Sequence, residues 1–366
     1  MSTLENFLNE HKNWEEILSA APYNLKIKKD GEYILFKYNQ IDSDFSLDEV
    51  REARGSIYKI KDNKFVCVCR PFDKFFNYGE KYAASIQWDS PNLSVTEKID
   101  GSLIKAWWDN DKWHWSTNGS INAAAICISG TETSFMELIE GAFQKNGLTT
   151  KLVEEILDSS CTYMFELVGP VNKIVIPYEQ NIYYLATRHN EDGCYLDDSS
   201  MFHNLIPIPT VVKMDNLKAI VDAAAELDWT HEGFVVYDGK NRIKVKSPIY
   251  VYAHHLANNG HVTTKSLINL ILMNETEEFL TYYPEYEKQI KDLRHQMKMH
   301  NIYINAARTV ASEHFTLPAA EYAKYVQKTF VKSFWDFLFK CYRNHNLTWN
   351  EYSKRLSSND WEKILI

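Results

Sequence analysis

A lysine followed by a glycine-containing turn is the first feature of this chain that could perform chemistry. Lys98, Ile99, Asp100 and Gly101 place an amine at the end of an expected strand, with a turn directly after it. A lysine amine becomes a nucleophile when burial or a nearby positive charge lowers its pKa and frees its lone pair. Glycine allows the backbone of the turn to approach another group closely. Lys98 is therefore a candidate nucleophile, and the competing interpretation is an exposed lysine beside an ordinary turn.

A second candidate is the lysine pair Lys244 and Lys246, which flanks Val245 in an expected strand. Side chains alternate across a strand, so both lysines should share one face. Two ammonium groups on one face repel each other unless an anion such as a triphosphate lies between them. The competing interpretation is a strand that simply presents charged residues to solvent.

Two glutamates and an arginine complete the candidate site. Glu232 enters an apolar strand through Gly233, where a carboxylate can orient a lysine or act beside a metal ion. Glu166 lies inside an apolar run, so it should have a partner such as a lysine or a ribose hydroxyl. Arg54 precedes a glycine and an expected strand, and its planar guanidinium suits phosphate.

The elements that position these residues are expected to be mainly strands and turns. Alternating apolar residues on both sides of short polar turns predict hairpins. The predicted hairpins are Ser56–Ile60 with Phe65–Cys69, Leu103–Trp108 with Trp113–Trp115, and Gly233–Tyr237 with Arg242–Lys246. Further strands are expected at Leu93–Lys98, Tyr163–Val168, Lys173–Ile176 and Ile182–Thr187. One helix is expected to begin after Asp215, which would cap it.

The pattern becomes helical after about residue 255. Apolar residues then recur every three or four positions, and glycine nearly vanishes after Gly260. The helical series are Tyr286, Ile290, Leu293 and Met297, and then Tyr322, Val326, Phe330, Phe334, Leu338 and Cys341. We therefore predict an α+β fold with a strand-rich domain in residues 1–255 and an all-helical domain in residues 256–366, separated by the turn Asn258–Gly260.

Composition limits the possible partners and compartment. The formal net charge is -9, so any nucleic acid should be held by local basic patches rather than by the whole surface. Six cysteines are few for a disulfide scaffold, and the first residues lack the apolar core of a signal peptide. No apolar run is long enough to cross a membrane. We expect a cytoplasmic protein with reduced thiols and no membrane partner.

Taken in order, the motifs resemble the RNA ligase 1 family of T-even-type bacteriophages, within the covalent nucleotidyltransferase superfamily. The matching segments are REARGSIY, RPFDKFFNYGE, EKIDGSLI, FELVGPVNKIVI, EGFVV and KVKS, all within residues 30–250. The resemblance implies an ATP-dependent RNA ligase that forms a lysyl-AMP, passes AMP to an RNA 5′-phosphate and seals that end to a 3′-hydroxyl, in tRNA or other RNA repair. It also implies a nucleotidyltransferase domain with ATP-grasp-like antiparallel sheets in residues 1–255, and an RNA-specificity domain in residues 256–366.

The resemblance further implies a role for each matched position. Lys98 would be the adenylated nucleophile. The residues that would bind ATP are Tyr38, Arg54, Lys74, Phe76, Gly101, Glu166, Glu232, Lys244 and Lys246. The implied metal is Mg²⁺ or Mn²⁺, linked to Glu232 and, in the helical domain, to Glu277. The implied partners are ATP and RNA ends such as those of nicked tRNA, bound by a monomer that would work in the host cytoplasm if it is of phage origin.

One segment departs from the family pattern. The family has lysines just before a Gly-Ser-Ile step, where this chain has Ser116 and Asn118. A contact to phosphate or RNA is therefore missing or supplied by another part of the chain.

The choice of RNA is expected to lie with the helical domain. Its candidate surfaces are the rows Lys288, Lys291, His295 and Lys298, and Lys324, Lys328 and Lys332, although both rows also fit an ordinary solvated helix face. Two alternative functions are a capping-type guanylyltransferase, which would normally carry an OB-fold in place of these helices, and a catalytically inactive RNA-binding relative.

Overall fold

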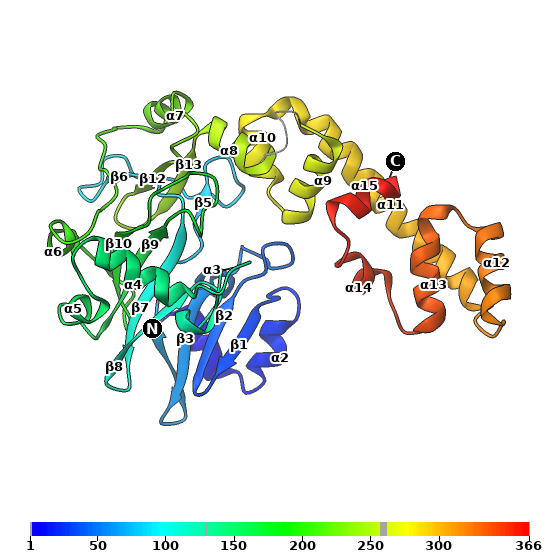
Figure 1. Ribbon diagram of the computed structural model, residues 1–366, viewed down its shortest axis with the longest axis horizontal. Helices are drawn as coiled ribbons and strands as arrows, with labels where there is room; N and C mark the ends of the chain where they lie inside the picture. The colour runs from blue at the N-terminus through cyan, green and yellow to red at the C-terminus, as the bar shows by residue number, and fades with distance from the viewer. Residues whose placement is uncertain (1, 129, 257–261, 366) are drawn as a thin grey trace. The chain divides into compact units, whose positions relative to one another are not determined.

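The computed structural model describes residues 2–128, 130–256 and 262–365. The chain divides into two compact units, Met1–His254 and His255–Ile366 (Figure 1). The predicted boundary turn Asn258–Gly260 lies outside the described residues. None of the described helices has both the length and the apolar character needed to cross a membrane.

Strands in the described part of the first unit form three sheets, with the orders β1-β2-β3-β4, β11-β10-β9-β7-β8 and β5-β13-β12-β6. The pairings are antiparallel, except for the parallel pair β5 and β13. The strands are β1 (Lys26–Asp30), β2 (Tyr33–Lys37), β3 (Arg54–Lys61), β4 (Lys64–Cys69), β5 (Phe76–Asn77), β6 (Ser94–Glu97), β7 (Ser102–Asp109), β8 (Lys112–Thr117), β9 (Cys161–Val168), β10 (Asn181–His189), β11 (Tyr195–Leu196), β12 (Gly233–Tyr237) and β13 (Arg242–Lys246).

Helices connect or flank these strands along the chain. They are α1 (Thr3–Glu10), α2 (Trp14–Ser19), α3 (Asp48–Glu52), α4 (Phe135–Lys145), α5 (Thr150–Glu154), α6 (Ser199–Phe202), α7 (Leu217–Ala225) and α8 (Pro248–Leu256). Leu35 and Trp107 belong to an apolar core between the first and second sheets. Phe143 of α4 packs with Phe165 of β9 on the other face of the second sheet, and Ile220 anchors α7 to the third sheet.

The predicted hairpins are confirmed as β3–β4, β7–β8 and β12–β13. The strand predicted at Lys173–Ile176 is wrong. The amides of Val175 and Ile176 instead donate to Asp100 Oδ2, both at 3.0 Å, so a carboxylate replaces a neighbouring strand as their acceptor. The predicted cap Asp215 is also wrong, because the amide of Ala219 donates to the side chain of Asn216.

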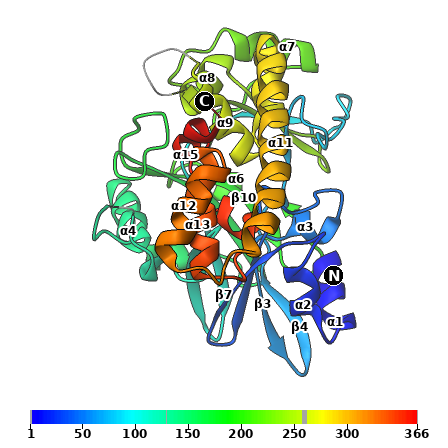
Figure 2. The same cartoon turned by 90° about the vertical axis from the view of Figure 1, so that its right-hand side faces the viewer.

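The described part of the second unit is helical throughout, which confirms the predicted α+β class with a helical C-terminal region. Its helices are α9 (Thr264–Met273), α10 (Thr276–Tyr282), α11 (Glu287–Ser312), α12 (Ala319–Thr329), α13 (Trp335–Arg343), α14 (Trp349–Ser353) and α15 (Ser358–Leu365). The last helix, α15, packs beside α9 (Figure 2). The apolar series from Tyr322 to Cys341 forms two helices rather than one, because Phe330 is extended and Lys332–Phe334 forms a 3₁₀ turn.

An uncharged histidine lies inside the second unit. His300 of α11 is 8% exposed, and the rings of Phe334, Trp349 and Trp361 lie 5.1, 5.3 and 5.9 Å from its ring. Its buried Nε2 has no hydrogen-bond partner among the described residues. Burial lowers the pKa of His300 from 6.5 to about 4.

We predict that His300 makes the protein less stable in acid. As the pH falls from 6.5 to about 4, the unfolded chain takes up a proton that the folded chain excludes. The loss of stability should reach about 3 kcal/mol. Denaturant unfolding at about pH 7.5 and about pH 4.5 should show a smaller acid loss for His300→Phe than for the wild type. His295→Phe, at an exposed position of the same helix, is the control, and equal acid loss in His300→Phe and the wild type would contradict this prediction.

Candidate active site

Lys98 lies where the chain passes from one sheet to another. The strand before it, β6, belongs to the third sheet, and the strand after it, β7, belongs to the second. The backbone amide of Lys98 donates to Gly233 O at 2.8 Å. Asp100, which is buried, accepts a hydrogen bond from the hydroxyl of Tyr250 at 2.9 Å in addition to the two backbone amides of residues 175 and 176. Asp100 thus fixes this crossover, and the turn is not part of a hairpin.

Gly101 is required by a close approach between two strands. A Cβ atom at this position would lie 2.9 Å from Val168 Cγ1 and nearer still to Leu167 O. Any larger residue would push β7 away from β9. The same approach places Glu166 Cγ 3.1 Å from that Cβ position, so Gly101 brings Glu166 beside the segment that carries Lys98.

Glu232 connects the candidate nucleophile to a strand lysine. Its side chain is 4% exposed, and Oε2 lies 2.6 Å from Lys98 Nζ while Oε1 lies 3.5 Å from Lys246 Nζ. Gly233 enables this geometry, since it has φ +135° and a Cβ there would lie 2.6 Å from Lys246 Cα. The register pairs Gly233 with Lys246, which sets Glu232 at the end of both strands.

Glu166 is a second carboxylate of this site and has a shifted pKa. Burial, helped by the charges of Glu232 and Asp100 and opposed by those of Lys98 and Arg54, raises the pKa of Glu166 to about 7. The lysine neighbour expected for Glu166 is therefore Lys98. Near neutral pH its carboxyl group exists in both protonation states and can either donate or accept a hydrogen bond.

Lys244 and Lys246 share one face of β13, as predicted. Ile243, which precedes Lys244, and Val245, which separates the two lysines, are buried on the other face. Lys244 Nζ lies 5.4 Å from the ring of Phe75, and the guanidinium of Arg54 lies 5.0 Å from the same ring. Through cation–π contacts, Phe75 therefore brings together Arg54 and Lys244, two side chains of the kind that bind phosphate. The sequence reasoning missed Phe75, and its place directly after Lys74 was the available signal.

Tyr38, Lys74 and Phe76 form a neighbouring group. Lys74 Nζ lies 5.4 Å from the rings of both Tyr38 and Phe76, and Phe76 is buried in the core beneath it. Burial by itself would raise the pKa of Tyr38, but the charges of Lys74, Arg54 and Lys37 outweigh it and lower the pKa. Phe76 thus supports Lys74 from the core side, and Tyr38, Arg54 and Lys74 lie together.

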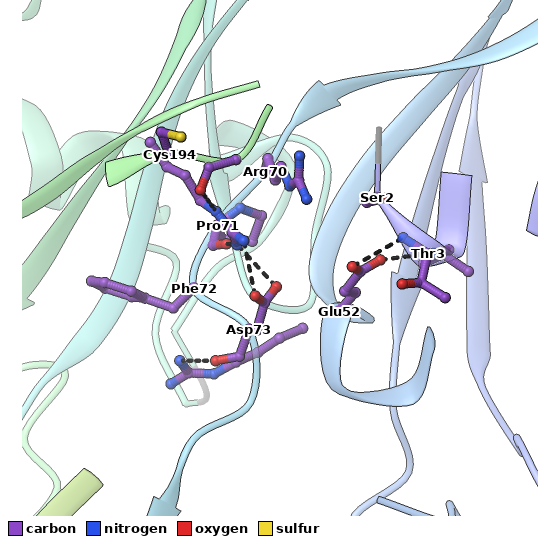
Figure 3. A network of polar contacts seen from close by, with 12 residues as sticks. Ser2, Thr3, Glu52, Arg70, Pro71, Phe72, Asp73 and Cys194 are labelled. Atoms are coloured by element: carbon purple, nitrogen blue, oxygen red, sulfur yellow. Dashed lines mark hydrogen bonds and ion pairs between the residues drawn. The ribbon is translucent and has the colours of Figure 1, made fainter. Parts of the chain in front are cut away.

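The segment that carries Lys74 and Phe75 is tied to β10 by an arginine. Arg188 donates to both oxygens of Asp73 at 2.9 and 2.8 Å and to Pro71 O at 2.6 Å. Figure 3 shows Asp73 and Pro71 within this network. A bidentate arginine–carboxylate pair restricts both partners, so Arg188 holds the segment in place. Arg54 contacts the same segment, because its guanidinium donates to Asp73 O at 3.5 Å.

The Ser116–Ile121 segment, which lacks the family's lysines, receives lysines from the first sheet. Lys28 Nζ donates to Gly119 O at 2.5 Å, and Lys37 Nζ lies 3.6 Å from the Cβ position of Gly119. Ser116 is fully buried and accepts a hydrogen bond from the indole of Trp107 at 3.2 Å, which explains why a charged lysine does not stand there.

The resemblance links Glu232 and Glu277 to a metal ion, and these links stay predictions. Within residues 2–128, 130–256 and 262–365, no group of three or more His, Cys, Asp or Glu side chains is arranged to hold a metal ion. Glu277 is exposed on α10 of the second unit, and its link to a metal stays a prediction.

Comparison with known proteins identifies the family. A family model described as RNA ligase matches residues 52–250. The chain is 32% identical to a putative bifunctional polynucleotide kinase/RNA ligase of Autographa californica nuclear polyhedrosis virus, over 80% of this chain and 42% of the relative. It is 25% identical to an RNA ligase of Rhodothermus phage RM378, over 84% of this chain and 86% of that protein. Among solved structures, an archaeal ATP-dependent RNA ligase aligns with 70% of this chain and 64% of its own at 13% identity and a TM-score of 0.41.

The family model and the viral relative place the chain among the covalent nucleotidyltransferases. Within that superfamily it belongs to the RNA ligase 1 family, which confirms the resemblance seen in its motifs. The chain spans less than half the length of the viral relative.

Proposed function

We propose that this protein is an ATP-dependent RNA ligase that joins RNA 5′-phosphate and 3′-hydroxyl ends through a lysyl-AMP and an RNA-adenylate, in RNA repair. The observation that carries the proposal is the contact of Lys98 Nζ with buried Glu232 at 2.6 Å, beside the second cation Lys246. A lysine held in this way, with further cations on neighbouring strands, suits attack on a phosphate. The relatives named RNA ligases support the same assignment.

In the first step the amine of Lys98 attacks the α-phosphorus of ATP. A nitrogen–phosphorus bond forms, the bond to the bridging oxygen breaks, and pyrophosphate leaves. Glu232 is placed to take the proton from Nζ because it already accepts a hydrogen bond from that atom. Glu166, which can donate or accept near neutral pH, is suited to bind a ribose hydroxyl.

The cations of the site stabilise the charge that moves onto the leaving group. Arg54 and Lys244 both lie near the ring of Phe75, and Lys246 lies beside Glu232. Fixed positive groups aimed at developing phosphate charge lower the barrier because they need no reorganisation during the reaction. The same groups can serve the transfer of AMP to the RNA 5′-phosphate, and the release of AMP when the 3′-hydroxyl attacks.

The donor set fits a divalent cation that is bound mainly through water and phosphate. Glu232 and Glu166 are the carboxylates beside Lys98, and Mg²⁺ commonly takes only one or two carboxylates while keeping several waters. Such an ion would neutralise negative charge on the phosphates.

The direct test is RNA joining with ATP or GTP. A 5′-phosphorylated RNA oligonucleotide should be circularised or joined with ATP and a divalent cation, and not with GTP. Capping-type chemistry would instead use GTP and would require a 5′-diphosphate end. That alternative is disfavoured because the described residues of the second unit contain no strand that could belong to an OB-fold.

We propose that the α11 face contributes to RNA choice. Lys288, Lys291 and Lys298 are exposed on this helix, and Lys291 also forms an ion pair with Glu287 at 2.7 Å. The other row, Lys324, Lys328 and Lys332, does not lie on one helix. Helix α12 ends at Thr329, and Lys332 lies in the following 3₁₀ turn.

Reversing charge on α11 should weaken the binding of structured RNA without reducing lysyl-AMP formation. We expect Lys288→Glu with Lys298→Glu to make the salt dependence of RNA binding shallower, because fewer counterions are released. Lys324→Glu with Lys328→Glu is the matched pair on α12. RNA affinity and salt slope equal to those of the wild type would show that the α11 row is ordinary surface.

A further inference from the structure

We propose that Lys28 and Lys37, at the turn that contains Gly119, bind a phosphate of the RNA strand next to its reacting 5′ end. This inference rests on the proposed ligase function and adds a binding site to it. Neither lysine was assigned a role by the sequence motifs.

The geometry brings three cations of the first sheet to one place. Lys28 Nζ donates to Gly119 O at 2.5 Å, and Lys37 Nζ lies 3.6 Å from the Cβ position of the same glycine. The register pairs Lys37 with Arg54 across β2 and β3, and pairs Lys28 with Leu35 on the same face as Lys37. Neighbouring strands lie about 4.8 Å apart, and Lys28 is two residues out of register with Lys37, whose partner on β1 is Lys26. Arg54, Lys37 and Lys28 therefore form a diagonal row across three strands that is about 12 Å long.

These cations form no ion pair with any carboxylate of the residues that the structure describes. In the described residues, no carboxylate oxygen lies within 4.0 Å of a charged nitrogen of Lys28, Lys37 or Arg54. The positive charge of Lys37 shifts the pKa values of two neighbouring groups. Lys37 helps to lower the pKa of Tyr38, and it adds to the effect of burial in lowering the pKa of Lys105. Like charges gathered without counter-charge favour the binding of an anion.

The arrangement suits a polynucleotide better than a single nucleotide. Arg54 is part of the site around Lys98, whereas Lys28 is exposed on β1, the edge strand of its sheet. The row therefore leads from the candidate nucleophile to open solvent. An RNA strand whose 5′-phosphate lies near Lys98 can place its next phosphate along that row. The triphosphate of ATP already has Lys244, Lys246 and Arg54 as binding groups in the proposed mechanism.

The test is equilibrium binding of a 5′-phosphorylated single-stranded RNA oligonucleotide to the full chain over a range of salt concentrations. The double variant Lys28→Ala with Lys37→Ala should bind about tenfold more weakly at low salt, and its salt slope should fall by about 0.7, since each phosphate contact to a single strand contributes about 0.7. Lys37→Arg should retain most of the affinity, because it keeps the charge. Lys61→Ala is the matched control, because Lys61 lies at the other end of β3, about 23 Å from Arg54.

A second measurement separates RNA from ATP as the source of the phosphate. The KM for ATP in lysyl-AMP formation should change far less than the RNA affinity in the double variant. A KM for ATP that rises by the same factor would assign the lysines to the triphosphate and overturn the inference, as would wild-type RNA affinity with a wild-type salt slope. The binding measurement needs no catalysis, so failure of the ligase proposal would appear separately, as a wild-type protein that forms no lysyl-AMP.

Discussion

The Lys98→Ala variant should form no covalent AMP adduct and should join no RNA from ATP. Lys98 Nζ is the amine held by Glu232 at 2.6 Å, at the crossover between two sheets. Removing it deletes the atom that forms the bond to phosphorus, so the expected loss is complete rather than partial. The side chain is partly exposed, so the variant should keep its fold.

A pre-adenylated RNA distinguishes this role from a structural one. The last step joins a 3′-hydroxyl to an RNA that already carries AMP, and it needs no lysine nucleophile. Lys98→Ala should therefore still seal pre-adenylated RNA at a measurable rate. Loss of this activity together with a lowered melting temperature would mean that Lys98 supports the fold instead of the chemistry.

The second large effect is expected from Glu232→Gln. The substitution keeps the size of a nearly buried side chain and removes its charge, so Lys98 and Lys246 lose the carboxylate that they share. The two ammonium groups then lose the counter-charge that they share, and the acceptor for the Lys98 proton is lost. We expect lysyl-AMP formation to slow by about 100-fold or more, comparable to the removal of one fixed charge-stabilising group from an active site.

Two comparisons define what Glu232 does. Glu226→Gln, at an exposed position after α7, should behave as the wild type. Glu232→Asp keeps the charge but shortens the side chain, so it should recover part of the rate if the charge is what matters. If Glu232→Gln forms lysyl-AMP at the normal rate, the contacts at 2.6 and 3.5 Å have no role in the first step.

Local patterns in the sequence were enough to predict the hairpins and the shared face of the strand lysines. Both depend on the alternation of side chains along a strand, which neighbouring residues determine. The alternation of Lys244 and Lys246 with buried residues on β13 is such a case. The helical second unit was predictable for the same reason, because its apolar residues recur at helical spacing.

Contacts between distant segments could not be predicted from these patterns. Asp100 looked like a turn residue, yet it anchors backbone amides 75 and 76 positions later in the chain. Lys28 contacts Gly119 across 91 positions, and no local period encodes that contact. The packing of Gly101 against β9 was not predictable either, since Leu167 and Val168 lie far from it along the chain.

The central claim is that Lys98 carries AMP, and peptide mapping after incubation with ATP and a divalent cation tests it most directly. The intact mass should increase by one AMP, and the modified peptide should contain Lys98. Lys105 is the informative rival, because burial lowers its pKa, but its amine is fully buried and donates to Gly55 O. AMP found on Lys105, on Lys246 or on any lysine other than Lys98 would contradict the assignment, as would a protein whose mass does not change.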